Sequence, residues 1–320
     1  MTKRVLLLML LMLVMCCAIV FAGDQKIGGL VFFDFGYDLT EDADNDGGFN
    51  ASRVYLTISK KLDDNLTYKF QTDIDYKNSP KNVYLKNAKV DWKTNLGKIT
   101  LGLQGMNVFG VQEKTWGYRF IEKSSMDRNK FSSSADLGVG YSNTFGSNIH
   151  LSALLTNGTG YKKAENDSHK KISIQSLIGQ KKLSSKDGYN GGVSFTMEPY
   201  DVDSVTVENK TVFGLFGGFA GSGIRVGGEF NTYSDAGADL SKQIISAYAI
   251  YGLSDDLNVF GRFDMYDPDT DTDSDSETYI IAGLEYKPAK GLYLAPNLKM
   301  TTPEGGDAET VVSVNCKFKF

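Results

Sequence analysis

Strict alternation of apolar and polar residues is the feature of this 320-residue sequence that most limits what the chain can fold into. The segment 66–76 is the clearest example. Its even-numbered residues are Leu, Tyr, Phe, Thr, Ile and Tyr, and its odd-numbered residues are Thr, Lys, Gln and two Asp. Because successive side chains of an extended strand point to opposite faces, such a segment has one apolar and one charged face. The pattern predicts β-strands and almost no helix.

Sixteen segments carry this pattern, which predicts sixteen strands of about 19 residues each, connection included. That spacing suits tilted membrane strands of about 9–11 residues with their turns and loops. The predicted strands lie near residues 26–38, 50–61, 66–76, 83–94, 98–107, 134–144, 148–158, 170–182, 188–198, 208–220, 223–233, 242–253, 257–267, 277–286, 291–300 and 308–320.

The connections between these segments alternate in length. Tight turns such as 63–65, 94–97 and 146–147 follow even-numbered strands, whereas longer polar segments such as 39–49 and 108–133 follow odd-numbered ones. Outer-membrane barrels have short periplasmic turns, long extracellular loops and an even strand count. We therefore predict an all-β fold, a sixteen-stranded antiparallel transmembrane β-barrel whose outer face contacts lipid. A soluble β-sandwich or jelly roll is the alternative, because alternation alone does not name the apolar partner.

Aromatic residues at strand ends favour the membrane barrel, because such barrels carry aromatic girdles at both interfaces. The lipid-facing aromatics of the two predicted rims are Tyr37, Tyr76 and Tyr84 at one, and Trp92, Phe145, Tyr251 and Tyr286 at the other.

The first 22 residues resemble a secretory signal peptide. Lys3 and Arg4 precede an apolar run over 5–21, and a small residue, Ala22, stands at the expected cleavage site. An uncleaved anchor helix is the alternative. Residues 23–320 then form an exported barrel with a single cysteine, Cys316, in the outer membrane of a Gram-negative-type bacterium.

A barrel of sixteen strands leaves a water-filled lumen, whereas eight strands fill their own interior. The alternation places Arg53, Lys69 and Lys89 on the lumen wall. Over all sixteen segments the inward positions carry twelve cations and eleven acids, so their sum does not decide an ion preference.

The longest connection, 108–133, is the candidate for a pore constriction. Five cations stand against three acids in it, which is a modest basic excess. A ring of cations in a constriction favours anions; the alternative is a solvated loop with self-neutralising pairs. The candidate selectivity residues are Lys114, Arg119, Lys123, Arg128 and Lys130 with Glu113, Glu122 and Asp127.

Several pieces of sequence, in order, are similar to the phosphate-selective porin family. They are 49–56, 60–64 and 68–70, then 116–119, 127–128, 133–138, 156–158 and 160–161. The resemblance covers about residues 26–161. It implies sixteen strands, a homotrimer and pores lined by the third loop, which folds into the lumen of general porins. Phosphate selectivity in that family depends on arginine and lysine arrays, and this chain has six arginines. The terminal strand ends in Phe320, which resembles the signal read by the outer-membrane insertion machinery.

Other motifs support no chemistry. The run Asp42-x-Asp44-x-Asp46-Gly47 begins like a calcium loop, but Arg53 occupies the position that needs a glutamate. The acidic run 267–277 is typical of a solvated loop, with divalent-cation binding as the alternative. The two histidines, His150 and His169, have no catalytic partners, so we predict no enzyme activity, metal site or cofactor.

The predicted function is that of an outer-membrane porin for passive diffusion of small hydrophilic solutes or ions, with anion preference as one option. A barrel whose acidic extracellular loops act in adhesion or surface binding is the alternative. The net charge of −5 offers no footprint for nucleic acid.

Overall fold

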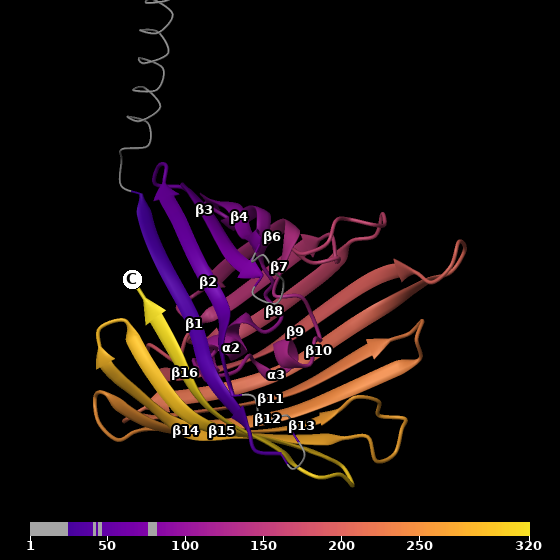
Figure 1. Cartoon of the computed structure of the whole chain (residues 1–320). Helices are drawn as coiled ribbons and strands as arrows, with labels where there is room; N and C mark the ends of the chain where they lie inside the picture. Colours follow the sequence, from indigo (N-terminus) through magenta and orange to yellow (C-terminus); the bar gives the residue numbers. More distant parts are fainter. Residues whose placement is uncertain (1–24, 41–42, 44–46, 76–81) are drawn as a thin grey trace, which may run out of the picture.

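The computed structural model describes residues 25–40, 43, 47–75 and 82–320, which form one closed barrel of sixteen antiparallel strands (Figure 1). Every strand pairs with its neighbours in sequence, and β1 (Lys26–Asp38) pairs with β16 (Glu309–Lys319) to close the sheet. Closure leaves no unpaired edge within the membrane. The remaining strands are β2 (Gly48–Lys61), β3 (Leu66–Asp75), β4 (Asn82–Thr94), β5 (Gly97–Gly105), β6 (Ala135–Phe145), β7 (Ile149–Thr156), β8 (Lys171–Gly179), β9 (Gly188–Asp201), β10 (Val207–Gly221), β11 (Ile224–Asp235), β12 (Leu240–Gly252), β13 (Leu257–Asp267), β14 (Glu277–Ala289) and β15 (Leu292–Pro303).

The fold class and strand count predicted from the alternation are confirmed, and no described strand boundary differs from its prediction by more than three residues. The predicted signal peptide lies outside the described residues. Among the described residues, no helix is both long and apolar enough to cross a bilayer.

Burial is inverted relative to a soluble protein. On β3, Phe70 is 42% exposed on the outer face, whereas its neighbour Gln71 is 8% exposed on the inner face. Leu101 and Leu155 are likewise exposed, and Thr100 and Thr156 beside them are buried. An outer surface of this kind requires an apolar solvent, which identifies the lipid-facing side of the sheet.

Most of the predicted rim aromatics are exposed on the outer face, in agreement with the sequence. Tyr76 lies outside the described residues. The exposed rim residues are Tyr37, Trp92, Phe145, Tyr251 and Tyr286.

Tyr84 was predicted on the lipid face, and this prediction is wrong. Leu85 and Asn87 pair with consecutive residues of β3, so Lys86 is an extra residue, a β-bulge in β4. A bulge shifts the alternation by one residue. The Tyr84 hydroxyl therefore points into the barrel, where it donates a hydrogen bond to Asp73 Oδ2 at 3.2 Å.

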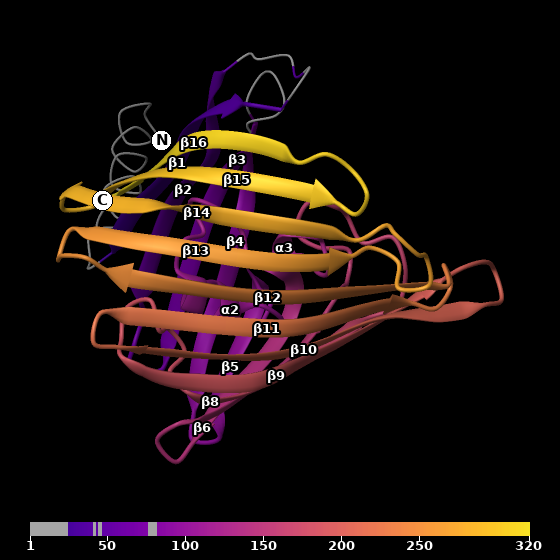
Figure 2. The ribbon, with the colours of Figure 1, turned by 90° about the horizontal axis from the view of Figure 1, so that it is seen from below.

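The two ends of the barrel differ, as Figure 2 shows. Connections of two residues, such as 95–96 and 222–223, lie at one end, together with both termini of the barrel domain. The opposite end carries the longer loops. Short turns face the periplasm in outer-membrane barrels, so we call these the periplasmic end and the outer end.

One connection departs from the predicted tight turns at the periplasmic end. Residues 180–187, between β8 and β9, fold inward, so that Leu183 is buried and the Ser184 N–H donates to Lys114 O at 3.1 Å. This turn therefore supports a segment that lies inside the barrel.

The assignment of faces predicts unequal tolerance of charge. Phe70→Arg places a guanidinium in lipid and is expected to destabilise the folded barrel by about 2–4 kcal/mol, if Phe70 lies near the bilayer midplane. Ser59→Arg is the matched control, because Ser59 faces the lumen next to Ile58, which pairs with Phe70. Urea titration of the folded band in liposomes measures both variants; equal losses would contradict the assignment.

Candidate functional site: the inward loop and the wall opposite it

The connection between β5 and β6, residues 106–134, lies inside the barrel, and we call it the inward loop (Figure 1). Side chains of the inner wall hold its backbone: Lys299 Nζ donates to Ile121 O at 2.8 Å, and Arg225 Nη2 donates to Trp116 O at 3.0 Å. These bonds come from β15 and β11, more than 100 residues away in sequence.

Two short helices shape the inward loop: α2 (Gly110–Trp116) and α3 (Ser125–Arg128). Helix α2 ends at Trp116 and is capped by Gly117, which has a positive φ of 78°. A side chain there would be strained, and its Cβ would lie 2.6 Å from Ser184 Cβ. Glycine therefore lets the chain reverse against the β8–β9 turn.

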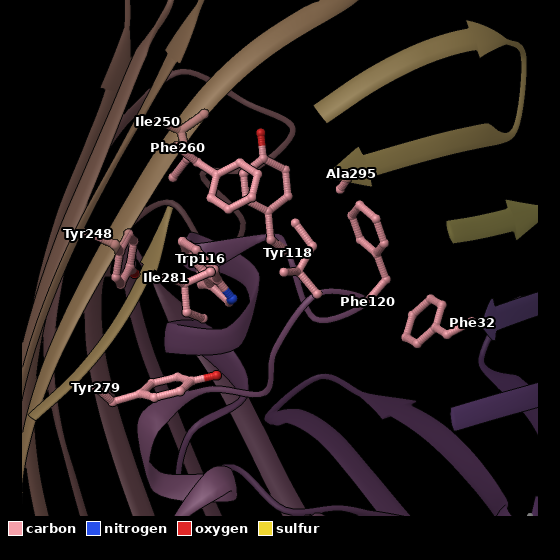
Figure 3. Packing of buried hydrophobic residues seen from close by; sticks show 11 residues of the cluster. Phe32, Trp116, Tyr118, Phe120, Tyr248, Ile250, Phe260, Tyr279, Ile281 and Ala295 are labelled. Atoms are coloured by element: carbon pink, nitrogen blue, oxygen red, sulfur yellow. The ribbon is translucent and has the colours of Figure 1, made fainter. Parts of the chain in front are cut away.

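Aromatic packing anchors the inward loop to one side of the barrel, as Figure 3 shows. Trp116 is 1% exposed, and its ring centroid lies 5.2 Å from that of Tyr248 on β12 and 6.1 Å from that of Phe260 on β13. Such edge-to-face contacts add to the energy gained by burying the rings. Other members of this cluster are Phe32, Tyr118, Phe120, Ile121, Ile250, Tyr279, Ile281 and Ala295.

A second cluster anchors the other half of the loop, and a third joins α2 to β8 and β10. Phe109, Met126 and Phe131 of the loop pack with wall residues that include Val212 and Ile244. The loop thus packs against strands between β7 and β15 and against β1. No described residue of β2–β6 belongs to any of the three clusters.

Strands β2–β5 therefore form the wall that lies outside the loop's apolar packing, and we call it the free wall; one polar contact to it is the hydrogen bond from Lys86 Nζ to Ser134 Oγ. A cavity of 210 Å³ is bordered by Arg53 of this wall and Arg119 of the loop, which places the two sides opposite each other. Alternation and register give the wall seven inward cations and three inward acids. The cations are Arg53, Lys61, Lys69, Lys86, Lys89, Lys93 and Lys98, and the acids are Asp73, Asp75 and Asp91.

Two carboxylates of the loop neutralise Arg119. Arg119 Nε lies 2.8 Å from Glu113 Oε2, and its Nη2 lies 2.8 Å from Asp127 Oδ2. Burial alone would lower the pKa of Arg119, but the two carboxylates outweigh it and raise that pKa. The triad ties α2 to α3 within the loop, and its one cation and two acids leave no free positive charge.

Two further predicted residues fasten the loop to the wall. Arg128 Nη1 lies 2.8 Å from Glu277 Oε1, and its guanidinium stacks 3.7 Å from the centroid of the Tyr279 ring. Glu122 accepts a hydrogen bond from the Tyr279 hydroxyl at 2.8 Å and lies 3.7 Å from Lys299 Nζ. Burial alone would raise the pKa of Glu122, but nearby cations and hydrogen bonds outweigh it. The pKa of this carboxyl is therefore lower than that of a free glutamate.

The remaining predicted cations, Lys114, Lys123 and Lys130, are exposed. In the described part of the chain, none of the three ammonium groups lies within 4.0 Å of a carboxylate. Desolvation by the surrounding protein lowers the pKa of Lys114. Glu113 opposes this effect, whereas Lys182, Lys89 and Lys98 add to it. These three residues are the loop's free charges.

The predicted wall residues line the free side. Arg53 stacks 4.5 Å from the Tyr55 ring centroid, Lys69 Nζ donates to Gln71 Oε1 at 3.3 Å, and Lys89 pairs with Asp91 at 3.1 Å.

Lys86 and Lys98 also line this wall, and neither was among the predicted site residues. Lys86 is 5% exposed; its Nζ donates to Ser134 Oγ and lies 3.6 Å from the Tyr161 ring centroid. In the sequence, the apolar Leu85 occupies a position where alternation requires a polar residue, and Lys86 occupies one where it requires an apolar residue. This break in the alternation indicates the bulge.

The acidic segments of the outer end show no ligand geometry. Among the described residues, no group of three or more His, Cys, Asp or Glu side chains is arranged to hold a metal ion. Asp42, Asp44 and Asp46 of the calcium-like run lie outside the described residues.

Solved outer-membrane proteins share this architecture. The chain superposes on an anion-selective porin from Comamonas acidovorans with a TM-score of 0.73 at 14% identity, over 93% of this chain and 99% of that one. It matches the trimer form of OmpT, an outer membrane protein of Vibrio cholerae, with a TM-score of 0.66 at 16% identity, over 93% of this chain and 100% of that one. OmpF of Salmonella typhi, solved with daunomycin, gives 0.69 at 12% identity, over 92% and 97%.

Sequence comparison places the chain in a family. A comparison with curated proteins gave no match. A family model described as Gram-negative porin matches residues 10–305, which is most of the chain. The chain therefore belongs to the Gram-negative porin family, and the molecule is a channel protein of the outer membrane.

Proposed function

We propose that this porin conducts small hydrophilic solutes and ions passively through the passage between the inward loop and β2–β5, and that it prefers anions. The observation that carries the proposal is the excess of seven cations over three acids on β2–β5, the wall outside the loop's apolar clusters. Lys61, Lys89 and Lys98 are ion-paired, and Lys86 is buried against Ser134 of the loop. The free cations of this wall, in the described part of the chain, are therefore Arg53, Lys69 and Lys93. Charges beside a narrow, low-dielectric wall are weakly screened, so an excess of one sign sets which ions enter.

The inward loop acts as the constriction in this proposal. Arg119 and Arg128 have carboxylate partners, so the loop's contribution to selectivity comes from Lys114, Lys123 and Lys130. The fields of Lys89 and Lys98 of the opposite wall act on Lys114, as does that of Glu113 beside it in the chain. The fold is similar to that of an anion-selective porin, which agrees with this preference.

Phosphate is one anion that such a passage could favour. The sequence resemblance to phosphate-selective porins points to it, and it stays a prediction. Reversal potentials measured under a potassium phosphate gradient, in place of KCl, test it directly.

Assembly is also part of the proposal. A homotrimer agrees with the trimer form of the similar OmpT. We further propose that residues 1–22 direct export and that the insertion machinery reads Phe320.

Adhesion through the acidic loops is the second candidate. The acidic run 267–277, with Glu304, gives the outer end a surface that could attract cationic partners. Conductance in a planar bilayer separates the two: discrete open steps support the porin, and a permanently closed barrel supports adhesion.

Reversing free cations is expected to change selectivity. In Lys69→Glu/Lys114→Glu, the reversal potential under a KCl gradient should move toward cation preference, and the shift should shrink at 1 M salt, where the Debye length is about 3 Å. Lys290→Glu, in the β14–β15 turn, is the control and should leave the potential unchanged. Equal shifts in both variants, or none in the double variant, would exclude these lysines as selectivity residues.

Removing the aromatic anchor is expected to free the loop. Trp116→Ala should weaken loop anchoring by about 3–5 kcal/mol, because a fully buried indole is lost, and should give a larger, noisier single-channel conductance. Trp92→Ala is the matched control, because Trp92 is 48% exposed on the outer face. An unchanged, quiet conductance in Trp116→Ala would show that the loop does not set the constriction.

The role of Phe320 can be separated from barrel closure. Its N–H donates to Gly29 O at 3.2 Å, and the Gly29 N–H donates to Phe320 O at 3.1 Å, so deletion removes a backbone pair as well as a ring. Phe320→Leu keeps the backbone pair. It should refold normally in detergent but insert more slowly with the purified insertion machinery, as followed by the heat-modifiable band. Wild-type insertion kinetics would argue against an aromatic signal.

A further inference from the structure

Basic and acidic residues of the lumen are separated along the barrel axis, although their numbers nearly balance. Under the inward loop, at the periplasmic end, lies a cavity of 470 Å³ roofed by Gly117 and Tyr118. It is bordered by six cations and two acids, Asp187 and Glu285. The cations are Lys182, Lys186, Arg225, Lys287, Lys317 and Lys319.

The cavity on the other side of the loop has the opposite sign. It measures 690 Å³, opens toward the outer end and is bordered by four acids and two cations. Both cations have acidic partners: Arg128 lies 2.8 Å from Glu277, and Lys299 lies 3.7 Å from Glu122. The acids left without an ion pair within 4.0 Å, in the described part of the chain, are Asp34, Asp38 and Glu309.

The free passage repeats this order. On β3, Asp73 and Asp75 lie toward the outer end, whereas Lys61 of β2 lies beside a periplasmic turn and pairs with Asp64 there. Lys93 and Lys98 flank the β4–β5 turn at the same end. Lys98 lies 3.5 Å from Asp91, so Lys93 is the cation of this turn without an ion pair within 4.0 Å in the described part of the chain. Acidic and basic segments therefore stand in series along the path of an ion, on the loop-covered side and on the free side alike.

We propose that the pore is a fixed-charge junction, acidic at its outer end and basic at its periplasmic end, so that its conductance depends on the polarity of the applied voltage. The inference rests on the proposed conduction of ions and adds a direction to it. No moving part is needed, because the asymmetry is fixed by which residues stand at the two ends of each strand.

The preferred polarity follows from which ions each segment collects. The acidic segment concentrates cations and the basic segment concentrates anions, over about one Debye length, which is about 10 Å at 0.1 M salt. When the outer side is positive, cations and anions both move toward the junction, and the pore fills with carriers. When the outer side is negative, both move away, and the junction is depleted. Conductance should therefore be higher with the outer side positive.

Single-channel recording in symmetric 0.1 M KCl at +100 and −100 mV tests the proposal. Orientation is read in a Ser185→Cys background by adding a bulky, impermeant thiol reagent to one side. Ser185 is exposed beside the periplasmic cavity, whereas the native Cys316 is buried. We expect a current ratio of about 2 or more at 0.1 M, falling toward 1 at 1 M, where the Debye length is about 3 Å.

Neutralising either end should reduce the ratio toward 1. The basic-end variant is Lys93→Gln/Lys317→Gln/Lys319→Gln, and the acidic-end variant is Asp38→Asn/Glu309→Gln. Lys290→Gln removes a periplasmic charge that borders neither cavity, and it should keep the wild-type ratio. Folding of each variant is verified by the heat-modifiable band.

The recordings distinguish failure of the charge junction from failure of the proposed ion conduction. Open channels with equal currents at both polarities, or with the larger current when the outer side is negative, would overturn the junction and leave the porin function intact. A ratio that persists unchanged in both end variants would also overturn it. Absence of any conducting step would overturn both the junction and the proposed conduction.

Discussion

The hydrocarbon core of a bilayer offers no hydrogen-bond partner to a polypeptide backbone, so a sheet that spans it must pair all of its strands. Here the pairing of β1 with β16, from Leu30 opposite Lys319 to Asp38 opposite Val311, completes the circle. Every other property depends on this closure. It separates a lipid-facing surface from an enclosed one, and it turns the two-residue period of each strand into an outside and an inside.

Sixteen strands enclose more space than their own inward side chains can fill. The inward loop occupies part of it, and the aromatic contacts of Trp116 with β12 and β13 decide which part. Hydrogen bonds from Lys299 and Arg225 to loop carbonyls hold the backbone against the same half of the wall. The loop thus leaves one sector, β2–β5, to face the passage, and the residues of that sector gain influence over permeating ions.

The charged residues of the lumen have two different roles: some hold the inward loop in place, and others act on permeating ions. Arg119 and Arg128 have carboxylates at 2.8 Å and hold the loop in place, whereas Lys114 has no such partner in the described part of the chain. An ion pair presents little net field to a passing solute, while an unpaired ammonium beside a low-dielectric wall presents a strong one. Counting charged residues along the loop therefore overstates its field, and pairing decides which of them act on ions.

The sequence by itself determined the barrel, because strand alternation is local: Leu66 to Asp75 reveals its two faces without reference to any other segment. It also singled out residues 108–133 as the candidate constriction, from their length and position. It missed the inward placement of Tyr84 and Lys86, because a single-residue bulge reverses the faces of the strand beyond it. Only the tertiary structure decided which wall the loop covers, which arginines are neutralised and how charge is ordered along the axis. Those properties depend on contacts such as Trp116 with Tyr248 and Arg128 with Glu277, more than 100 residues apart in the chain, and no local pattern encodes such distances.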